Sequence, residues 1–177
     1  MLGKAADHTT EDEFVQLLLD CHGRIRNFAA GARRLATAET DEVSADEVRD
    51  TAWRIRRYFG EALPLHVADE EESLYPRLHG RDTEVDAALE RMEREHADHR
   101  PHLATLLELC GMLAEAPERH ATLRTQLGET AGVLEREFGR HLEHEEALIL
   151  PAIPRLLTLE EQAAMTRELR ERRARQW

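Results

Sequence analysis

Histidine and glutamate recur at the same spacing in two distant segments of the sequence. The segments HVADEEESLYP, which begins at His66, and HLEHEEALILP, which begins at His141, both contain His-x-x-x-Glu-Glu followed by a proline. Side chains four residues apart lie on one face of a helix, which pairs His66 with Glu70 and His141 with Glu145. Imidazole and carboxylate groups held together in this way supply the lone pairs that a metal ion accepts.

Two further histidines interrupt apolar stripes at helical spacing. His22 lies between Leu18 and Ile25 in the first stripe, and His96 follows Met92 in the third. Each histidine of the repeat interrupts a stripe in the same way. All four lie about 12 or 13 residues from the same end of the bundle, which places them in one layer roughly 18–20 Å deep. The residues expected in this layer are His22, His66, His96, His141, Glu70 and Glu145.

Burying so many polar groups without partners would cost several kcal/mol. A bound metal ion removes this cost. The mixed nitrogen and oxygen donors, without a thiolate, suit iron, manganese or zinc. The alternative is a buried hydrogen-bonded network, which for any single histidine would be the ordinary interpretation.

Capping signals and breaks divide the chain into helices. Capping boxes begin at Thr10, Ser44 and Thr158, each followed three residues later by glutamate. The short connections predict antiparallel neighbours. We therefore expect an all-α fold, an up-down-up-down four-helix bundle with a short C-terminal fifth helix. The helices are predicted at about 10–38, 44–79, 83–115, 118–153 and 158–175.

Composition limits the classes of partner. The formal net charge of −12, from 24 basic and 36 acidic residues, would repel a phosphate backbone, so nucleic-acid binding is not expected. The basic run Arg167–Arg175 falls in the last turns of a helix, where cations complement the macrodipole. No apolar run reaches the roughly 20 residues that span a bilayer, and no hydrophobic leader follows Met1. We expect a cytoplasmic protein without membrane contact, with Cys21 and Cys110 reduced.

At the positions of this layer the sequence resembles the hemerythrin-like (HHE cation-binding) domain family. The family pattern is a histidine on the first helix, His-x-x-x-Glu on the second, a histidine on the third and His-x-x-x-Glu on the fourth. His22, in the segment DCHGRIR, and His96, in REH, match the single histidines. The segments that begin at His66 and His141 match the two pairs.

The resemblance implies a fold and a cofactor. It covers about residues 10–175 and implies one hemerythrin-like domain over 1–177, with a core bundle at about 10–153 and a C-terminal helix at about 158–175. It also implies a non-haem di-iron centre with an oxo or hydroxo bridge, with zinc or manganese as alternative metals. Its small ligand would be dioxygen, peroxide or nitric oxide, and no protein partner is indicated.

The sequence departs from the oxygen-carrying hemerythrins on the third helix. Oxygen-carrying hemerythrins place two histidines four residues apart there, whereas Arg100 stands four residues after His96. His99, three residues after His96, lies on the same core stripe and is a further candidate metal ligand. With five histidines, two octahedral irons would keep about one open position, which suits reversible oxygen binding. If only four histidines bind, two or more coordination positions stay open, and redox chemistry becomes easier.

Several functions stay open at this point. The first is a di-iron protein that binds or reduces dioxygen or peroxide, in oxygen handling, peroxide removal or redox sensing. A peroxidase, catalase-like or oxidase activity would be compatible with it, although no dedicated catalytic acid or base is evident. The alternatives are an iron-handling or iron-responsive module in which the metal is mainly structural, and a mononuclear or zinc site.

Residues around the layer are expected to have supporting roles. Glu71 and Glu146 should belong to a solvated acidic rim, from which one could hydrogen-bond a ligand imidazole. Cys21 should point about 100° away from the histidine that follows it. Pro64 and Pro101 should kink their helices beside the site.

Overall fold

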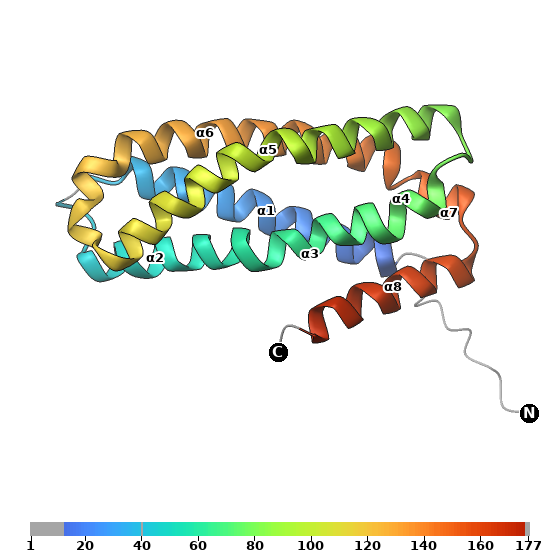
Figure 1. Cartoon of the computed structure of the whole chain (residues 1–177), viewed down its shortest axis with the longest axis horizontal. Coiled ribbons are helices and arrows are strands. Elements are labelled where there is room, and N and C mark those ends of the chain that lie inside the picture. Colours follow the sequence, from blue (N-terminus) through green and yellow to red (C-terminus); the bar gives the residue numbers. More distant parts are fainter. Residues whose placement is uncertain (1–12, 40, 176–177) are drawn as a thin grey trace, which may run out of the picture.

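The structure, a computed structural model, describes residues 13–39 and 41–175, which form helices and no strand. The predicted all-α fold is confirmed (Figure 1). In chain order the elements are α1 (Glu13–Thr37), α2 (Ala45–Arg57), the π-helical segment η1 (Tyr58–Ala62), α3 (Leu63–Ala68), the π-helical segment η2 (Asp69–Leu74), α4 (Tyr75–Leu78), α5 (Thr83–Glu115), the 3-10 turn η3 (Pro117–Arg119), α6 (His120–His144), the π-helical segment η4 (Glu145–Ile149), α7 (Ala152–Leu156) and α8 (Leu159–Ala174).

Four long helical rods form the bundle. The first is α1, the second runs from α2 to α4, the third is α5, and the fourth runs from α6 through η4. The helix α1 packs on α2 and α6, and α5 packs on the same two helices. Rods that follow one another in the chain are therefore neighbours and run antiparallel, as Figure 1 shows.

Capping boxes fix the starts of two helices as predicted. The side chain of Ser44 accepts a hydrogen bond from the amide of Glu47, whose carboxylate accepts one from the Ser44 amide in return. Thr158 and Glu161 form the same pair before α8. Each box satisfies two amides at the helix start that have no partner within the helix. The capping box predicted at Thr10 lies outside the described residues.

A π-helical turn precedes Pro64, where the sequence predicts a kink. In η1, just before this proline, the amide of Leu63 bonds to the carbonyl of Tyr58, five residues earlier. Proline lacks an N–H group and its ring clashes with the carbonyl four residues back, so the wider turn lets the rod continue past it. Pro101, in contrast, lies inside the continuous helix α5, and the kink expected there produces no break in the helix.

The other two π-helical segments carry the glutamates of the repeat. The carbonyl of Glu70 accepts a hydrogen bond from the amide of Tyr75, and that of Glu145 accepts one from the amide of Leu150. In both cases the two residues are five apart, and a proline follows directly. Such turns occur often at functional sites, because they re-aim a side chain without breaking the helix.

Two apolar clusters fill the bundle, one on each side of the predicted polar layer. On α1 the boundary between the clusters falls between Leu18 and Ile25, and on α5 between Met92 and Leu106. The histidines of these two helices lie within those gaps. The polar layer is thus enclosed by hydrocarbon above and below.

The helix α8 packs against α1, α3 and η2 on the outside of the bundle (Figure 1). Two arginines of the predicted basic run, Arg172 and Arg173, form ion pairs with the buried carboxylate of Asp69. The basic run at the end of α8 therefore pairs with a buried carboxylate in addition to complementing the helix macrodipole.

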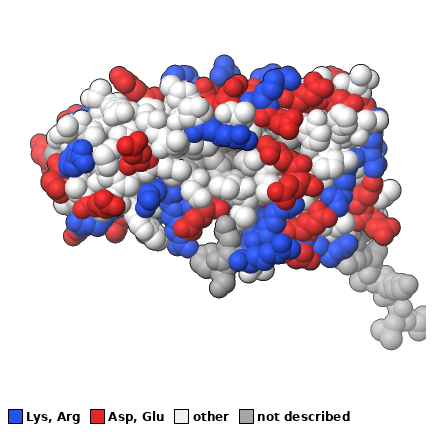
Figure 2. Space-filling model, in the orientation of Figure 1, with Lys and Arg blue, Asp and Glu red and all other residues white. Residues whose placement is uncertain are grey.

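Figure 2 shows acidic and basic side chains interspersed over one face of the molecule, with basic side chains gathered along α8. Such a mixed surface presents no continuous basic track on this face. Among the described helices, none combines the length and the apolar character needed to cross a membrane.

Candidate metal centre

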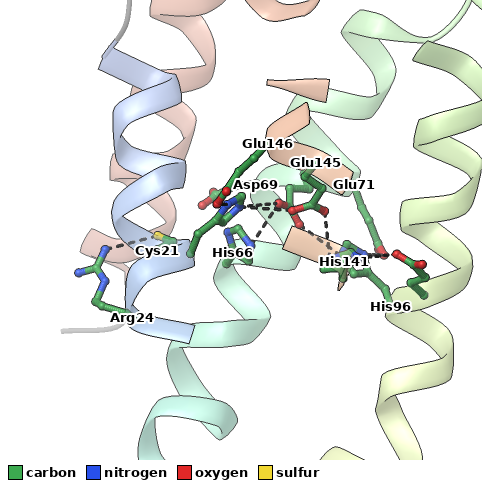
Figure 3. Close-up of polar contacts among 12 residues, drawn as sticks. Cys21, Arg24, His66, Asp69, Glu71, His96, His141, Glu145 and Glu146 are labelled. Atoms are coloured by element: carbon green, nitrogen blue, oxygen red, sulfur yellow. Dashed lines mark hydrogen bonds and ion pairs between the residues drawn. The ribbon is translucent and has the colours of Figure 1, made fainter. Parts of the chain in front are cut away.

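The four histidines and two glutamates predicted from the sequence meet in the bundle core. Figure 3 shows His66, His96, His141 and Glu145 among them. Each of the six is at most 6% exposed. Helix α1 supplies His22, and the second rod supplies His66 and Glu70. His96 comes from α5, and the fourth rod supplies the remaining pair, His141 and Glu145. The layer inferred from helix lengths is thus present as predicted.

Each glutamate faces histidines of different helices. Oε1 of Glu70 lies 3.1 Å from His66 Nε2, and its Oε2 lies 3.3 Å from His96 Nε2. Oε1 of Glu145 lies 3.0 Å from His141 Nε2, and its Oε2 lies 3.3 Å from His22 Nε2. Each carboxylate therefore lies between an imidazole of its own rod and an imidazole of another rod.

The donor atoms form two groups that share both glutamates. One group consists of His22, His66, Glu70 and Glu145, and the other of Glu70, His96, His141 and Glu145. Within each group the ligand atoms all lie within 4.8 Å of one another. Each group offers two nitrogens and two oxygens, a donor set that suits a transition-metal ion.

The hydrogen bonding of these atoms fits a cation. No described group forms an aligned hydrogen bond with Nε2 of His22, His66 or His96. The same holds for Oε2 of Glu70 and for both carboxylate oxygens of Glu145. Buried polar atoms nearly always form hydrogen bonds, so a set that lies close together without aligned hydrogen bonds indicates donors aimed at a common ion.

Electrostatics couple the two glutamates to the imidazoles around them. Burial by itself would lower the pKa of His22, but the nearby carboxylates of Glu145 and Glu70 raise it to about 10. Burial would also lower the pKa of His96, but the nearby carboxylates, Glu70 first, raise it to about 9. Burial would raise the pKa of Glu70, yet the neighbouring imidazoles hold it well below its ordinary value. Without metal, protons on the histidines therefore neutralise the buried carboxylates.

Carboxylates outside the layer hold three of the four imidazoles by their other nitrogen. Nδ1 of His22 lies 2.9 Å from Glu146, that of His96 lies 2.9 Å from Glu71, and that of His141 lies 2.9 Å from Glu95. With Nε2 facing the centre, Nδ1 carries the proton and donates it to the carboxylate, which orients the ring and strengthens Nε2 as a ligand. Glu71 and Glu146 thus form hydrogen bonds with candidate ligands rather than only forming a solvated rim.

Sequence reasoning missed the third of these supports. Glu95 directly precedes His96 on α5 but bonds to the imidazole of His141 on the neighbouring helix. Its position before a core histidine was a usable signal. The bond crosses between helices, however, and helical periodicity describes only one helix at a time.

Nδ1 of the fourth imidazole, that of His66, has no aligned hydrogen bond among the described residues. The thiol of Cys21, the residue just before His22, is buried. Burial by itself would raise the pKa of this thiol, but the interaction with His66 and the Arg24 guanidinium lower it to about 7. Figure 3 shows the sulfur of Cys21 with Arg24 at the edge of the layer. Both cysteines are free, as expected.

His99 lies beside the layer and belongs to neither group of donors. Its ring makes edge contacts with Phe138 and with the ligand His141, at centroid distances of 4.9 Å and 5.1 Å. Burial, followed by the positive fields of His141 and His96, lowers the pKa of His99 to about 4, so the ring is neutral near pH 7. His99 lines a small cavity of about 30 Å³ whose walls also include His66, His96 and His141.

Comparison with known proteins agrees with this arrangement. The model of the hemerythrin HHE cation binding domain matches residues 13–153, which contain all four histidines and both glutamates of the layer. Among curated proteins, no relative matches the chain. Because the family match covers most of the chain, and the predicted ligands converge in its core, the chain belongs to the hemerythrin HHE cation-binding domain family.

Proposed function

We propose that this chain is a non-haem di-iron protein that binds or reduces dioxygen or peroxide. The observation that carries the proposal is the sharing of Glu70 and Glu145 by both groups of donors. A carboxylate that faces two donor groups can bridge two cations and neutralise part of their charge, as in di-iron carboxylate bundles. A single ion would leave half of the buried imidazoles without a partner.

The number of donor atoms favours a metal ion that keeps some of its coordination positions open. Each group offers two imidazole nitrogens and two carboxylate oxygens. Four donors would satisfy a tetrahedral structural zinc ion, whereas an octahedral ion would keep positions for a further ligand. The small cavity beside the layer is the observation that favours the second case, because it provides space for such a ligand.

The cavity limits what that ligand can be. Its volume of about 30 Å³ exceeds the roughly 10–15 Å³ that one water molecule needs, so it fits a molecule of a few heavy atoms. Its walls are mostly apolar and include Ile25, Leu63 and Phe138. When bound, iron would supply the electrons for chemistry with dioxygen or peroxide. The protein would supply the bridging carboxylates, the oriented imidazoles and a mostly apolar pocket.

Anaerobic loading with ferrous iron, followed by exposure to dioxygen, peroxide or nitric oxide, tests this function. We expect new charge-transfer absorption with at least one of the three, and the same protein loaded with zinc is the matched control. Oxygen release from peroxide would indicate an enzyme, and a reversible band under dioxygen a carrier or sensor. A large rise in melting temperature with iron, without any response to the three molecules, would instead indicate an iron-handling module in which the metal is structural.

A further inference from the structure

We propose that the C-terminal helix α8 is coupled to the metal centre, because it holds the π-helical turn η2 in the orientation in which Glu70 faces both groups of donors. Asp69, Arg172 and Arg173 are then positioning residues for Glu70. The inference rests on the metal centre of the proposed function, but not on which metal binds or on its reaction. It concerns a helix that lies beyond the residues matched by the family model.

The contacts between α8 and η2 join charged and polar groups that are out of reach of water. Oδ1 of Asp69 accepts a hydrogen bond from Nη1 of Arg172 at 2.9 Å, and its Oδ2 lies 2.8 Å from Nη2 of Arg173. The hydroxyl of Ser73 accepts a hydrogen bond from Nη2 of Arg172 at 2.8 Å and donates one to Glu168 at 2.5 Å. Asp69 and Ser73 are both fully buried. Helix α8 therefore provides the partners that these two side chains need.

Arg77, in α4, connects the backbone of the same turn to α8. Its Nη2 donates to Oε1 of Glu168 at 2.6 Å, and its Nη1 donates to the backbone carbonyl of Ser73 at 2.7 Å. The turn η2 is thus held at its first residue, Asp69, and again near its end, at Ser73.

The internal repeat shows that these contacts belong to only one of the two glutamate-bearing turns. The turn η4 has the same π-helical form and carries Glu145, but His144 and Leu148 occupy the positions that correspond to Asp69 and Ser73. Leu148 packs against an apolar cluster of the core. Hydrocarbon contacts therefore help to hold η4, whereas the buried side chains of η2 depend on α8 for polar partners.

The effect on Glu70 follows from the cost of leaving Asp69 without its partners. A buried carboxylate that has lost its cations is strongly disfavoured, so without α8 the Asp69 side chain would turn towards water. Glu70 is the next residue of the same turn, and its oxygens face His66 at 3.1 Å and His96 at 3.3 Å. A rotation of the turn that exposes Asp69 would carry Glu70 away from these imidazoles. Docked α8 therefore favours metal binding, and by linkage bound metal favours docked α8.

Anaerobic titration of ferrous iron against a chromophoric chelator tests this coupling. The double variant Arg172→Ala, Arg173→Ala should bind iron about tenfold more weakly, which is within the usual range of coupling between two sites. Arg173→Ala alone leaves Arg172 bonded to Asp69 and should cause a smaller loss, and it decides the question if the double variant does not fold. Arg170→Ala is the matched control, because Arg170 lies on the same helix but pairs with Glu13 of α1. It should leave the iron affinity unchanged.

Hydrogen exchange adds a readout that a purely structural role of α8 would not change. In the wild-type protein, iron should slow amide exchange in α8, although no residue of α8 belongs to either group of donors. In the double variant, iron should slow this exchange much less. Unchanged iron affinity in the folded variants, or wild-type α8 exchanging equally fast with and without iron, would overturn the inference and leave the proposed function intact. A wild-type protein that binds no iron would instead contradict the proposed function itself.

Discussion

The carboxylate of Asp69 lies 2.9 Å from the guanidinium of Arg172, which joins the segment carrying a candidate metal ligand to the C-terminal helix. Asp69 is fully buried and directly precedes Glu70. Arg173 adds a second contact at 2.8 Å, and Arg172 also donates to the Ser73 hydroxyl at 2.8 Å. The family match ends at residue 153, so α8 lies beyond it and still supplies the counter-ions of η2.

Asp69→Ala should destabilise the protein strongly. It would leave two guanidinium groups, with side chains 16% and 29% exposed, without their buried partner. Removing one member of a buried ion pair lowers the free energy of unfolding by about 3 kcal/mol. Urea unfolding measures this change. The control is Glu171→Ala, which removes an exposed pair with Arg175 and should change stability by less than about 0.5 kcal/mol. Equal effects of the two substitutions would show that α8 is not anchored through Asp69.

The metal-free protein should lose stability as the pH rises above neutrality. The pKa of His22 is raised to about 10 and that of His96 to about 9, both above the ordinary value of 6.5. A raised pKa means that the folded state binds protons more tightly, so this stability is complete below about pH 6.5 and disappears as the pH passes 9 to 10. The pKa of Glu70 is lowered, so its contribution is lost in acid instead.

Melting temperatures of the metal-free protein between pH 6 and pH 10 test this expectation. The protein loaded with zinc serves as the comparison, because metal binding requires deprotonated imidazoles. The stability of the zinc-loaded protein should not fall over the same alkaline range. A metal-free protein whose melting temperature stays constant up to pH 10 would contradict the proposed proton binding at the layer.

His99→Leu should keep both ions and alter the binding of a small ligand. His99 lies outside both groups of donors but lines the cavity next to them. Among the described residues, no hydrogen-bond partner for its ring is found, so a molecule in the cavity would be its natural partner. Loss of one hydrogen bond, worth about 1 kcal/mol, should change the dissociation rate of nitric oxide by about fivefold.

The control for this prediction is His102→Leu, on the same helix but away from the cavity. It should leave the nitric oxide dissociation rate unchanged. Elemental analysis of His99→Leu shows whether His99 only lines the cavity or also binds a metal ion. Loss of an ion would make it a fifth metal-binding histidine, the role that its position on the core stripe predicts.

Much of the bundle could be predicted from the sequence because its signals are local. Capping boxes at Ser44 and Thr158 fixed helix starts, and apolar periodicity identified the core faces. The layer followed from helix lengths alone, because the regular rise per residue converts positions into depths. The convergence of His22, His66, His96 and His141 confirms that reasoning.

What could not be predicted depends on contacts between helices. The hydrogen bonds between Glu95 and His141 and between Glu146 and His22 cross from one rod to another. Asp69 reads as one more acidic residue in the run DEEE, although α8 buries it completely. The π-helical turns at the repeat glutamates also escaped prediction, since the apolar stripe continues through them with nearly unchanged spacing.

The metal content of the protein tests the central claim most directly. Elemental analysis of protein produced with iron available, and purified without added metal, gives the ratio of each metal to chain. Two bridging carboxylates shared by four imidazoles predict two irons per chain. One ion per chain, zinc in place of iron, or no bound transition metal would contradict the paired iron centre.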